Sequence, residues 1–205
     1  MLKIWGRNTS SNVQMAMWAV GELGLPHQRI DIGGPFGTTP EYQKMNPNLV
    51  VPTLEEDDGF ILWESKSIIR YLAEKHNGAI LPKDVRQRAR ASQWMDWQLS
   101  VQGPAITPVF WGLVRTPPEK RDPVAIDAAK KKITAAMNIL NDALGKTEFV
   151  AGSDFSYGDI PVGVQAYRYY RLLDDRPAQP NLDRWYAAIS SRPAFKEQVA
   201  AVPFV

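Results

Sequence analysis

The order of strand-like and helix-like segments limits the folds open to this chain more than any other feature. Segments that alternate apolar and polar residues interchange with segments of helical spacing up to about residue 77. From Asp84 onward the pattern predicts helices alone. We therefore expect an α/β domain over residues 1–77, a linker over 78–84 and an all-helical domain over 85–205.

The α/β region is predicted to run strand, helix, strand, helix, strand, strand, helix. Asp57-Asp58-Gly59 is a hairpin turn between the last two strands. Thr39 caps the short second helix and Pro40 opens it. The predicted segments are Leu2–Gly6, Val13–Leu23, Gln28–Ile32, Thr39 to Asn46, Val50–Leu54, Phe60–Trp63 and Glu64–Lys75.

The second region contains one predicted helix that proline interrupts. Asp84 caps a helix from Val85, and Pro104 and Pro108 in its continuation predict a kink, because proline removes a backbone donor and clashes with the preceding turn. A second helix is predicted from Asp122-Pro123 to about Gly145. Further helices are expected to begin at Ser156, near Asn181 and at Pro193.

Composition excludes several classes of chemistry. The chain of 205 residues has no cysteine, which excludes disulfides, thiolate metal sites and a cysteine nucleophile. Its two histidines, His27 and His76, have no motif around them, so we expect structural roles and no metal. The net charge of +2 comes without a basic run, which argues against nucleic acid as a partner. No apolar stretch nears the ~18 residues of a membrane span, and without an export signal a cytoplasmic location is expected.

The segment Ser156-Tyr157-Gly158-Asp159 has the form of a capping box with Asp in the position usually held by Glu. Phe155 and Ile160 complete a hydrophobic staple around it. We interpret Ser156 and Asp159 as structural. Loss of the Asp159 carboxylate is expected to cost ~0.5–2 kcal/mol, the usual range for a helix cap.

Three local features have both a structural and a functional interpretation. Ser10 or Ser11 can simply cap the first helix, or a hydroxyl at that helix start can stabilise an anion such as a thiolate. Glu64-Ser65 lies where a strand meets a helix, a place that gathers free N–H groups for a carboxylate. Val51-Pro52 lies at a strand entry, where proline is tolerated.

Together these residues resemble a cytosolic glutathione transferase over essentially the whole chain. The most specific part is the series Asn46-Pro47, Val51-Pro52-Thr53-Leu54, Trp63-Glu64-Ser65 and Ile68-Ile69-Arg70-Tyr71-Leu72. The opening Gly6 to Gln14 resembles bacterial members with a serine-type site, of theta-, phi- or nu-like character. The resemblance implies a thioredoxin-like first domain and an all-helical second one.

The resemblance also implies a glutathione site. Val51, before a cis Pro52, would present its backbone to the cysteinyl part of glutathione, and Glu64 and Ser65 would hold the γ-glutamyl group. Ser10 would point its hydroxyl at the sulfur. Thr9, Ser11 and Asn12 stay open as alternatives to Ser10.

One departure from the family lies beside this site. Many relatives carry Gly followed by Gln, Lys or Arg before the apolar–Pro pair, where this chain has Leu49 and Val50. A polar contact to glutathione is therefore missing there. Lys44, Asn48 or the Phe36-Gly37 loop are the candidates to replace it.

The second substrate implied by the resemblance is a small apolar electrophile, and relatives are usually homodimers. Trp94 and Trp97 are candidates for the dimer interface. The expected activity is transfer of the glutathione thiolate to that electrophile. The alternatives are peroxidase, isomerase or dehalogenase chemistry on the same fold, or a binding protein without activity. The candidate electrophile contacts are Arg7, Asn8, Thr107, Phe110, Trp111, Arg115 and Tyr167.

Overall fold

The computed structural model describes residues 1–205 and divides into two compact units. The first contains a four-stranded sheet in the order β2-β1-β3-β4. β1 and β2 are parallel, whereas β3 is antiparallel to both β1 and β4. The strands are β1 (Leu2–Trp5), β2 (His27–Ile30), β3 (Thr53–Glu55) and β4 (Ile61–Trp63). Along the chain these strands alternate with helices in the order strand, helix, strand, helix, strand, strand, helix, which is the order that the sequence predicts.

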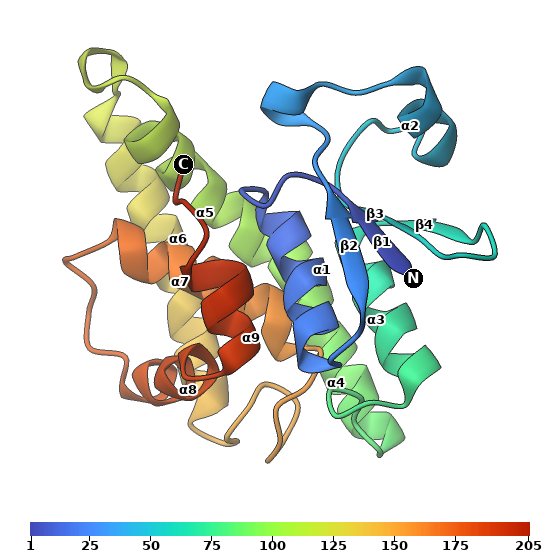
Figure 1. The fold of residues 1–205 in the computed structure, drawn as a ribbon. Helices are drawn as coiled ribbons and strands as arrows, with labels where there is room; N and C mark the ends of the chain where they lie inside the picture. Colours follow the sequence, from blue (N-terminus) through green and yellow to red (C-terminus); the bar gives the residue numbers. More distant parts are fainter. The chain divides into compact units, whose positions relative to one another are not determined.

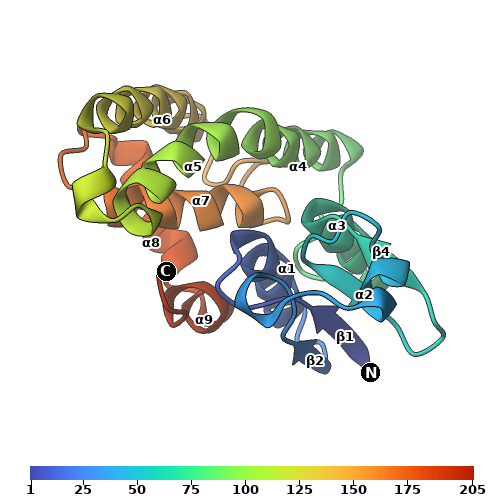
Figure 2. The ribbon, with the colours of Figure 1, turned by 90° about the horizontal axis from the view of Figure 1, so that it is seen from above.

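Two helices cover one face of this sheet. α1 (Ser11–Glu22) and α3 (Ser65–His76) lie side by side on it, as Figures 1 and 2 show. Ile4 and Leu54 face each other across β1 and β3, and both are fully buried. They pack with apolar residues of the two helices, and burial of each such side chain contributes ~1.5–3 kcal/mol.

The third strand begins later than the sequence predicts. Val50 to Leu54 is the predicted segment, but β3 starts at Thr53. Pro52 has no N–H to donate, so ladder pairing begins only after it, with Thr53 opposite Trp5. Val51 and Pro52 therefore stay outside the ladder, and this position becomes important for the site.

α2 (Pro40–Met45) is the short helix that the sequence predicts. The Thr39 hydroxyl accepts a hydrogen bond from Tyr42 N at 3.2 Å, which confirms the predicted cap. A single 3₁₀ turn, Gly34–Phe36, precedes it in a loop with several positive φ angles.

The division into residues 1–77, 78–84 and 85–205 stays a prediction. The two compact units of the structure differ from it mainly at the C-terminal end of the chain. The first unit contains residues 1–81 together with 193–204. α9 (Pro193–Phe195) and the π-helical turn Lys196–Ala200 pack on α1. Phe195 meets Trp18 edge-on with ring centroids 4.9 Å apart.

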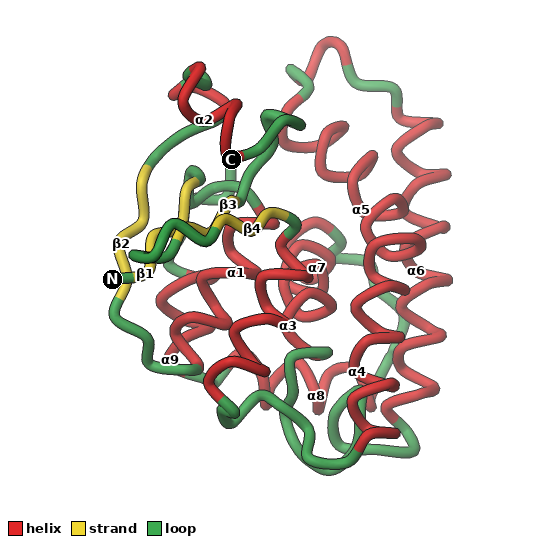
Figure 3. The backbone as a smooth tube through the Cα atoms, turned by 90° about the vertical axis from the view of Figure 1, so that its right-hand side faces the viewer, coloured by secondary structure: helices red, strands yellow, loops and turns green.

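The second unit is helical, which confirms the predicted class of this region. Helices α5 and α6 lie alongside each other in it, as the red tubes of Figure 3 show. No helix of the chain is both long and apolar enough to span a membrane. The helices are α4 (Val85–Trp97), α5 (Gly103–Phe110), α6 (Pro123–Leu144), α7 (Asp159–Leu172) and α8 (Pro180–Ser190), with a 3₁₀ turn at Pro118–Lys120.

The proline-rich part of the second unit changes helix type instead of stopping. A π-helical turn over Gln98–Gln102 joins α4 to α5 just before Pro104. Pro108 lies inside α5, and a second π-helical turn, Trp111–Arg115, follows it. Wider turns of this kind accommodate backbone groups that proline leaves without an intrahelical partner.

The predicted capping box forms, but its arrangement differs from the prediction. α7 begins at Asp159, three residues after the predicted start at Ser156. Asp159 Oδ2 accepts from Ser156 N at 2.9 Å, as in a capping box, whereas Ser156 Oγ accepts from Gly158 N at 3.3 Å and not from Asp159.

The Asp159 carboxylate also serves partners that sequence analysis does not reveal. Its Oδ1 accepts from Val150 N at 3.0 Å and from Trp185 Nε1 at 2.8 Å. The carboxylate is fully buried, and burial raises its pKa to about 6 although the four donated hydrogen bonds act in the opposite direction. Asp159 therefore joins the start of α7 to α8 and is more than a local cap.

Candidate functional site

A hollow of about 450 Å³ opens in the first unit beside the end of β1. Pockets of this size are typical of small-molecule sites. Its wall comes from three loops, which follow β1, follow β2 and precede β3. The lining residues are Arg7, Ser10, Asn12, Gly33, Gly34, Gly37, Thr38, Leu49, Val50 and Val51.

Ser10 lies at the N-cap position of α1, but its side chain does not cap the helix. Its backbone C=O accepts from Gln14 N at 2.9 Å, while Ser10 Oγ makes no hydrogen bond to the helix start. The hydroxyl oxygen of an N-cap serine usually accepts a hydrogen bond from an N–H group of the first helical turn. Here the hydroxyl is available to the hollow, at the positive end of a 12-residue helix.

The other predicted residues of the first loop differ in position. Asn12 lines the hollow together with Ser10, whereas Thr9, Ser11 and Asn8 do not. Ser11 is the first residue of α1.

Val51 precedes a cis peptide bond to Pro52, as the resemblance implies. Neither the backbone N–H nor the C=O of Val51 takes part in a hydrogen bond within the protein. Gly6 allows the close approach here, because a Cβ on Gly6 would lie 2.5 Å from Val13 Cγ2 and 3.1 Å from Val51 Cβ. Backbone groups without a partner at a partly closed hollow are ready to pair with an extended ligand.

Two buried side chains of the α2 region hold this loop, and sequence analysis missed their role. The Tyr42 hydroxyl donates to Val50 O at 2.6 Å and lies 2.9 Å from Thr53 Oγ1. Asn46 Nδ2 donates to the same Val50 O at 2.9 Å. Tyr42 and Asn46 are fully buried, and burial raises the pKa of the Tyr42 phenol, so it stays a neutral donor. The Asn-Pro motif in the sequence was the available signal for Asn46.

Glu64 and Ser65 lie at the start of α3. Glu64 adopts φ +74°, an uncommon conformation for a residue with a side chain, and such residues concentrate at ligand sites. Ser65 is 3% exposed, and the sole partner of its hydroxyl is Met15 Sδ at 4.0 Å. No side chain caps α3. A ligand carboxylate would meet the Ser65 hydroxyl and the positive end of α3 together.

Leu49 and Val50, which form the departure from the family pattern, line the hollow. Leu49 adopts φ +56° and is 40% exposed, and Val50 is also exposed. Asn48 Nδ2 donates to Asn46 Oδ1 at 3.3 Å, and Lys44 is an exposed residue of α2. Neither Lys44 nor Asn48 lines the hollow.

In the second unit, Phe110 is the centre of an arginine cluster. Phe110 is 4% exposed, and the guanidinium carbons of Arg168 and Arg115 lie 4.2 and 5.6 Å from its ring centroid. Burial and the charge of Arg115 lower the pKa of Arg168 to about 10. Phe110 and Arg115 were predicted from the sequence, whereas Arg168 was not, because nothing in the pattern around Tyr167 distinguishes it.

The other candidate electrophile contacts of the second unit differ in exposure and in hydrogen-bond partners. Thr107 Oγ1 donates to Gly103 O at 2.8 Å within α5. Trp111 is 59% exposed, whereas Tyr167 is buried with the Arg171 guanidinium 5.7 Å from its ring centroid.

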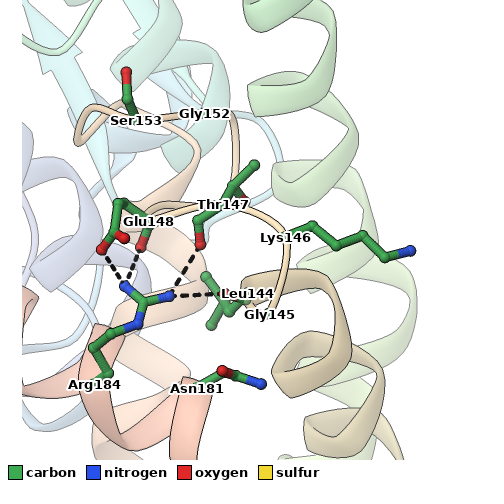
Figure 4. Close-up of a pocket in the computed structure, with 9 residues that line it drawn as sticks. All are labelled: Leu144, Gly145, Lys146, Thr147, Glu148, Gly152, Ser153, Asn181 and Arg184. Carbon is green, nitrogen blue, oxygen red and sulfur yellow. Dashed lines mark hydrogen bonds and ion pairs between the residues drawn. The ribbon is translucent and has the colours of Figure 1, made fainter.

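A second hollow, lined by the loop after α6 and by α8, is shaped by a structural arginine (Figure 4). Arg184 Nη2 donates to Leu144 O at 2.7 Å and Thr147 O at 3.0 Å, and Nη1 pairs with Glu148 Oε2 at 2.5 Å. The Arg184 guanidinium therefore hydrogen-bonds carbonyl groups at the C-terminal end of α6 and in the loop that follows it. No group of three His, Asp or Glu side chains suited to a metal occurs in the chain.

Comparison with known proteins shows the family of the chain. Residues 9–75 match the family model described as glutathione S-transferase, N-terminal domain, and residues 123–188 match the C-terminal domain model. Glutathione S-transferase GstB of Escherichia coli K12 is 39% identical over 203 residues, which are 97% of this chain and 98% of that protein. The chain belongs to the glutathione S-transferase family.

Solved structures and more distant relatives lie within the same family. The theta class glutathione S-transferase of Xanthomonas axonopodis pv. citri, with glutathione bound, superposes with a TM-score of 0.94 at 38% identity, covering 100% of this chain and 99% of that chain. Glutathione S-transferase F12 of Arabidopsis thaliana is 28% identical over 96% of each chain. The predicted family and the two-part glutathione transferase fold are thus confirmed.

Proposed function

We propose that this family member conjugates the glutathione thiolate to small hydrophobic electrophiles, with Ser10 activating the sulfur. The observation that supports this most is the Ser10 hydroxyl, which lines the hollow and has no partner in the protein. The glutathione bound to the Xanthomonas relative supports the same ligand for this chain.

Glutathione would bind in an extended form against the first unit. Its cysteinyl backbone pairs with the N–H and C=O of Val51, which have no other partner. Its γ-glutamyl carboxylate accepts from the Ser65 hydroxyl at the start of α3, and Glu64 receives the ammonium group. Tyr42 and Asn46 keep the Val51 loop in place for this pairing.

The energy needed to activate the thiol is within reach of these groups. A free thiol has a pKa of ~8.5, so about 3% is thiolate at pH 7. Lowering the pKa by two pH units takes ~2.7 kcal/mol. A hydroxyl that donates to an anion contributes ~1.5–3 kcal/mol, and a helix N-terminus adds ~0.3–1 kcal/mol.

The reaction needs no covalent intermediate on the protein. The thiol proton leaves to solvent, and the sulfur lone pair forms a bond to the electrophilic carbon. The leaving group, a halide for an aryl halide, departs with the bonding electrons. Ser10 stays a hydrogen-bond donor throughout and is not itself a nucleophile.

The electrophile would meet aromatic and cationic side chains. Trp111, which is 59% exposed, would supply apolar surface, and the exposed Arg115 would be a partner for an anionic substituent. Phe110 and Tyr167 are buried and would act from behind this surface. We also propose that the protein is a homodimer, as is usual in the family. Trp94 and Trp97 of α4, half-buried with ring centroids 4.9 Å apart, are candidates for the interface. Light scattering would measure the mass in solution.

Paired serine variants test the assignment. Ser10→Ala removes a hydroxyl that lines the hollow, whereas Ser11→Ala removes its neighbour, which does not. Conjugation of glutathione to 1-chloro-2,4-dinitrobenzene is followed by product absorbance. We expect Ser10→Ala to lower kcat/KM by about 10- to 100-fold, the loss of one hydrogen bond to an anion, and Ser11→Ala to stay near wild type.

Two other results would change the proposal. Equal loss in both serine variants would refute the role of Ser10, and Asn12, which also lines the hollow, would be tested next as Asn12→Ala. Glutathione binding without conjugation, but with turnover of an organic hydroperoxide, would favour the peroxidase alternative.

A further inference from the structure

Arg7 occupies a constrained position in the same hollow as Ser10. Its side chain lies over two glycines of the loop after β2. A Cβ on Gly34 would lie 2.9 Å from Arg7 Nε, and one on Gly33 would lie 3.3 Å from Arg7 Nη1. Gly33 and Gly34 also adopt φ of +77° and +59°, so glycine is suited to both positions. The loop is thus shaped to admit this guanidinium.

The same glycine relates Arg7 to the loop before β3. The position of a Cβ on Gly33 would be 3.1 Å from Val51 Cγ1, close to its distance from Arg7 Nη1. Arg7 Nη1 and Val51 Cγ1 therefore both lie close to one point beside Gly33. Arg7 also lines the hollow together with Ser10 and Val51. In the proposed function Val51 offers its backbone to the cysteinyl part of glutathione and Ser10 meets the sulfur, so we place the guanidinium in the part of the site that would hold the sulfur.

No acidic group neutralises Arg7. It is the one ionisable residue among those that line the hollow, and its guanidinium forms no ion pair or hydrogen bond. Asp31, which follows β2, is paired with Arg29, and Arg29 Nη1 also donates to Gly6 O at 2.9 Å. The charged residues of the neighbouring α2, Glu41 and Lys44, do not line the hollow, and neither does Glu64 in the turn before α3.

We propose that Arg7 is the counter-cation of the glutathione thiolate, acting beside the Ser10 hydroxyl, and is not primarily an electrophile contact. This inference rests on the proposed function. Arginine stays protonated at every pH of interest, so it stabilises the ionised thiol and gives nothing to the neutral one. An opposite charge at ~4–6 Å lowers a pKa by about 1–3 pH units.

Titration of the bound thiol tests this inference. Thiolate absorbance of the glutathione complex is measured against pH for wild type, Arg7→Gln, Arg7→Lys and, as a control for net charge, Arg86→Gln on the exposed side of α4. We expect the thiol pKa to rise by about one pH unit in Arg7→Gln, and to stay within a few tenths of wild type in Arg7→Lys and Arg86→Gln. Glutathione affinity at pH 5, where the thiol is neutral, should change less than threefold.

The outcomes separate this inference from the proposed function. If wild type itself leaves the bound thiol pKa near ~8.5, the proposed function fails. If wild type lowers it and Arg7→Gln lowers it equally, Arg7 is not the counter-cation. A large loss of affinity at pH 5 with an unchanged thiol pKa would instead make Arg7 a binding group for a glutathione carboxylate. Loss of glutathione binding in both Arg7→Gln and Arg7→Lys would give Arg7 a structural role. Each of these last two results would overturn the inference.

Discussion

Removal of the Asp159 carboxylate should destabilise the protein far more than removal of an ordinary helix cap. Asp159→Ala leaves three N–H donors without an acceptor in the buried region, those of Val150, Ser156 and Trp185. At the middle of the ~1–3 kcal/mol range for each, these cost about 6 kcal/mol. The buried charge is relieved at the same time, which returns about 3 kcal/mol for a pKa raised from 3.8 to about 6. The net expected loss is about 3 kcal/mol, above the range that the sequence alone predicts.

A matched exposed cap provides the control. Asp122 Oδ1 accepts from Val124 N and Ala125 N at 3.0 Å each, but at an exposed position where water can replace the carboxylate. Asp122→Ala should therefore cost ~1 kcal/mol.

Urea unfolding, followed by fluorescence and by far-UV circular dichroism, gives both midpoints. With an m-value of ~3 kcal/mol/M, Asp159→Ala should lower the midpoint by about 1 M and Asp122→Ala by about 0.3 M. Coincident transitions by the two probes justify the two-state treatment of a chain with two compact units. Equal midpoint shifts in the two variants would refute the network reasoning.

Three further predictions follow from the same contacts. The folded-state pKa of Asp159 is raised to about 6, so the folded state binds an extra proton between pH ~4 and 6. The stability of wild type relative to Asp159→Asn should therefore grow by about 2.4 kcal/mol as the pH falls from 7 to 4; a constant difference in urea unfolding across this range would refute it. Tyr42→Phe removes the hydrogen bond to Val50 O, so KM for glutathione should rise about three- to tenfold; an unchanged KM in steady-state kinetics would mean that Tyr42 does not hold this loop. Ser65→Ala should weaken glutathione binding about 10- to 100-fold in calorimetry with little change in unfolding, because the hydroxyl meets only Met15 Sδ within the protein; a large loss of stability would show a structural role instead.

Features that depend on a few neighbouring residues could be predicted from the sequence. The caps at Thr39 and Asp84 form as predicted, because each serves N–H groups two or three residues ahead. α6 likewise begins at Asp122-Pro123 as predicted, with Asp122 as its cap. The hairpin turn ending at Gly59 likewise joins β3 to β4. All the residues that form such a cap or turn lie within a few consecutive positions of the sequence.

Features that join distant parts of the chain could not be predicted. Nothing near Asp159 in sequence indicates the donor on Trp185, 26 residues away. The Tyr42 contact to Thr53 spans 11 residues and depends on the fold. Pro104 indicated that the helix would be disturbed, but whether a kink or a π-helical turn results depends on the packing of the surrounding helices.

The candidate site was predicted more by resemblance than by local pattern. Ser10 is indistinguishable from a simple N-cap in the sequence, and only the backbone geometry leaves its hydroxyl uncommitted. Arg7 was predicted as an electrophile contact. Its approach to Gly33 and Gly34 could not be predicted, because it brings together two loops about 26 residues apart in the sequence.

Proton release on glutathione binding tests the central claim most directly. Calorimetry at pH 7 in two buffers of different ionisation enthalpy gives the number of protons released, and S-methylglutathione, which has no ionisable thiol, is the control ligand. A bound thiol pKa near ~6.5 predicts release of about 0.7 proton per site for glutathione. We expect that release for glutathione and essentially none for S-methylglutathione. Equal release for both ligands would mean that the site binds glutathione as a neutral thiol, which contradicts thiolate activation by Ser10 and its neighbours.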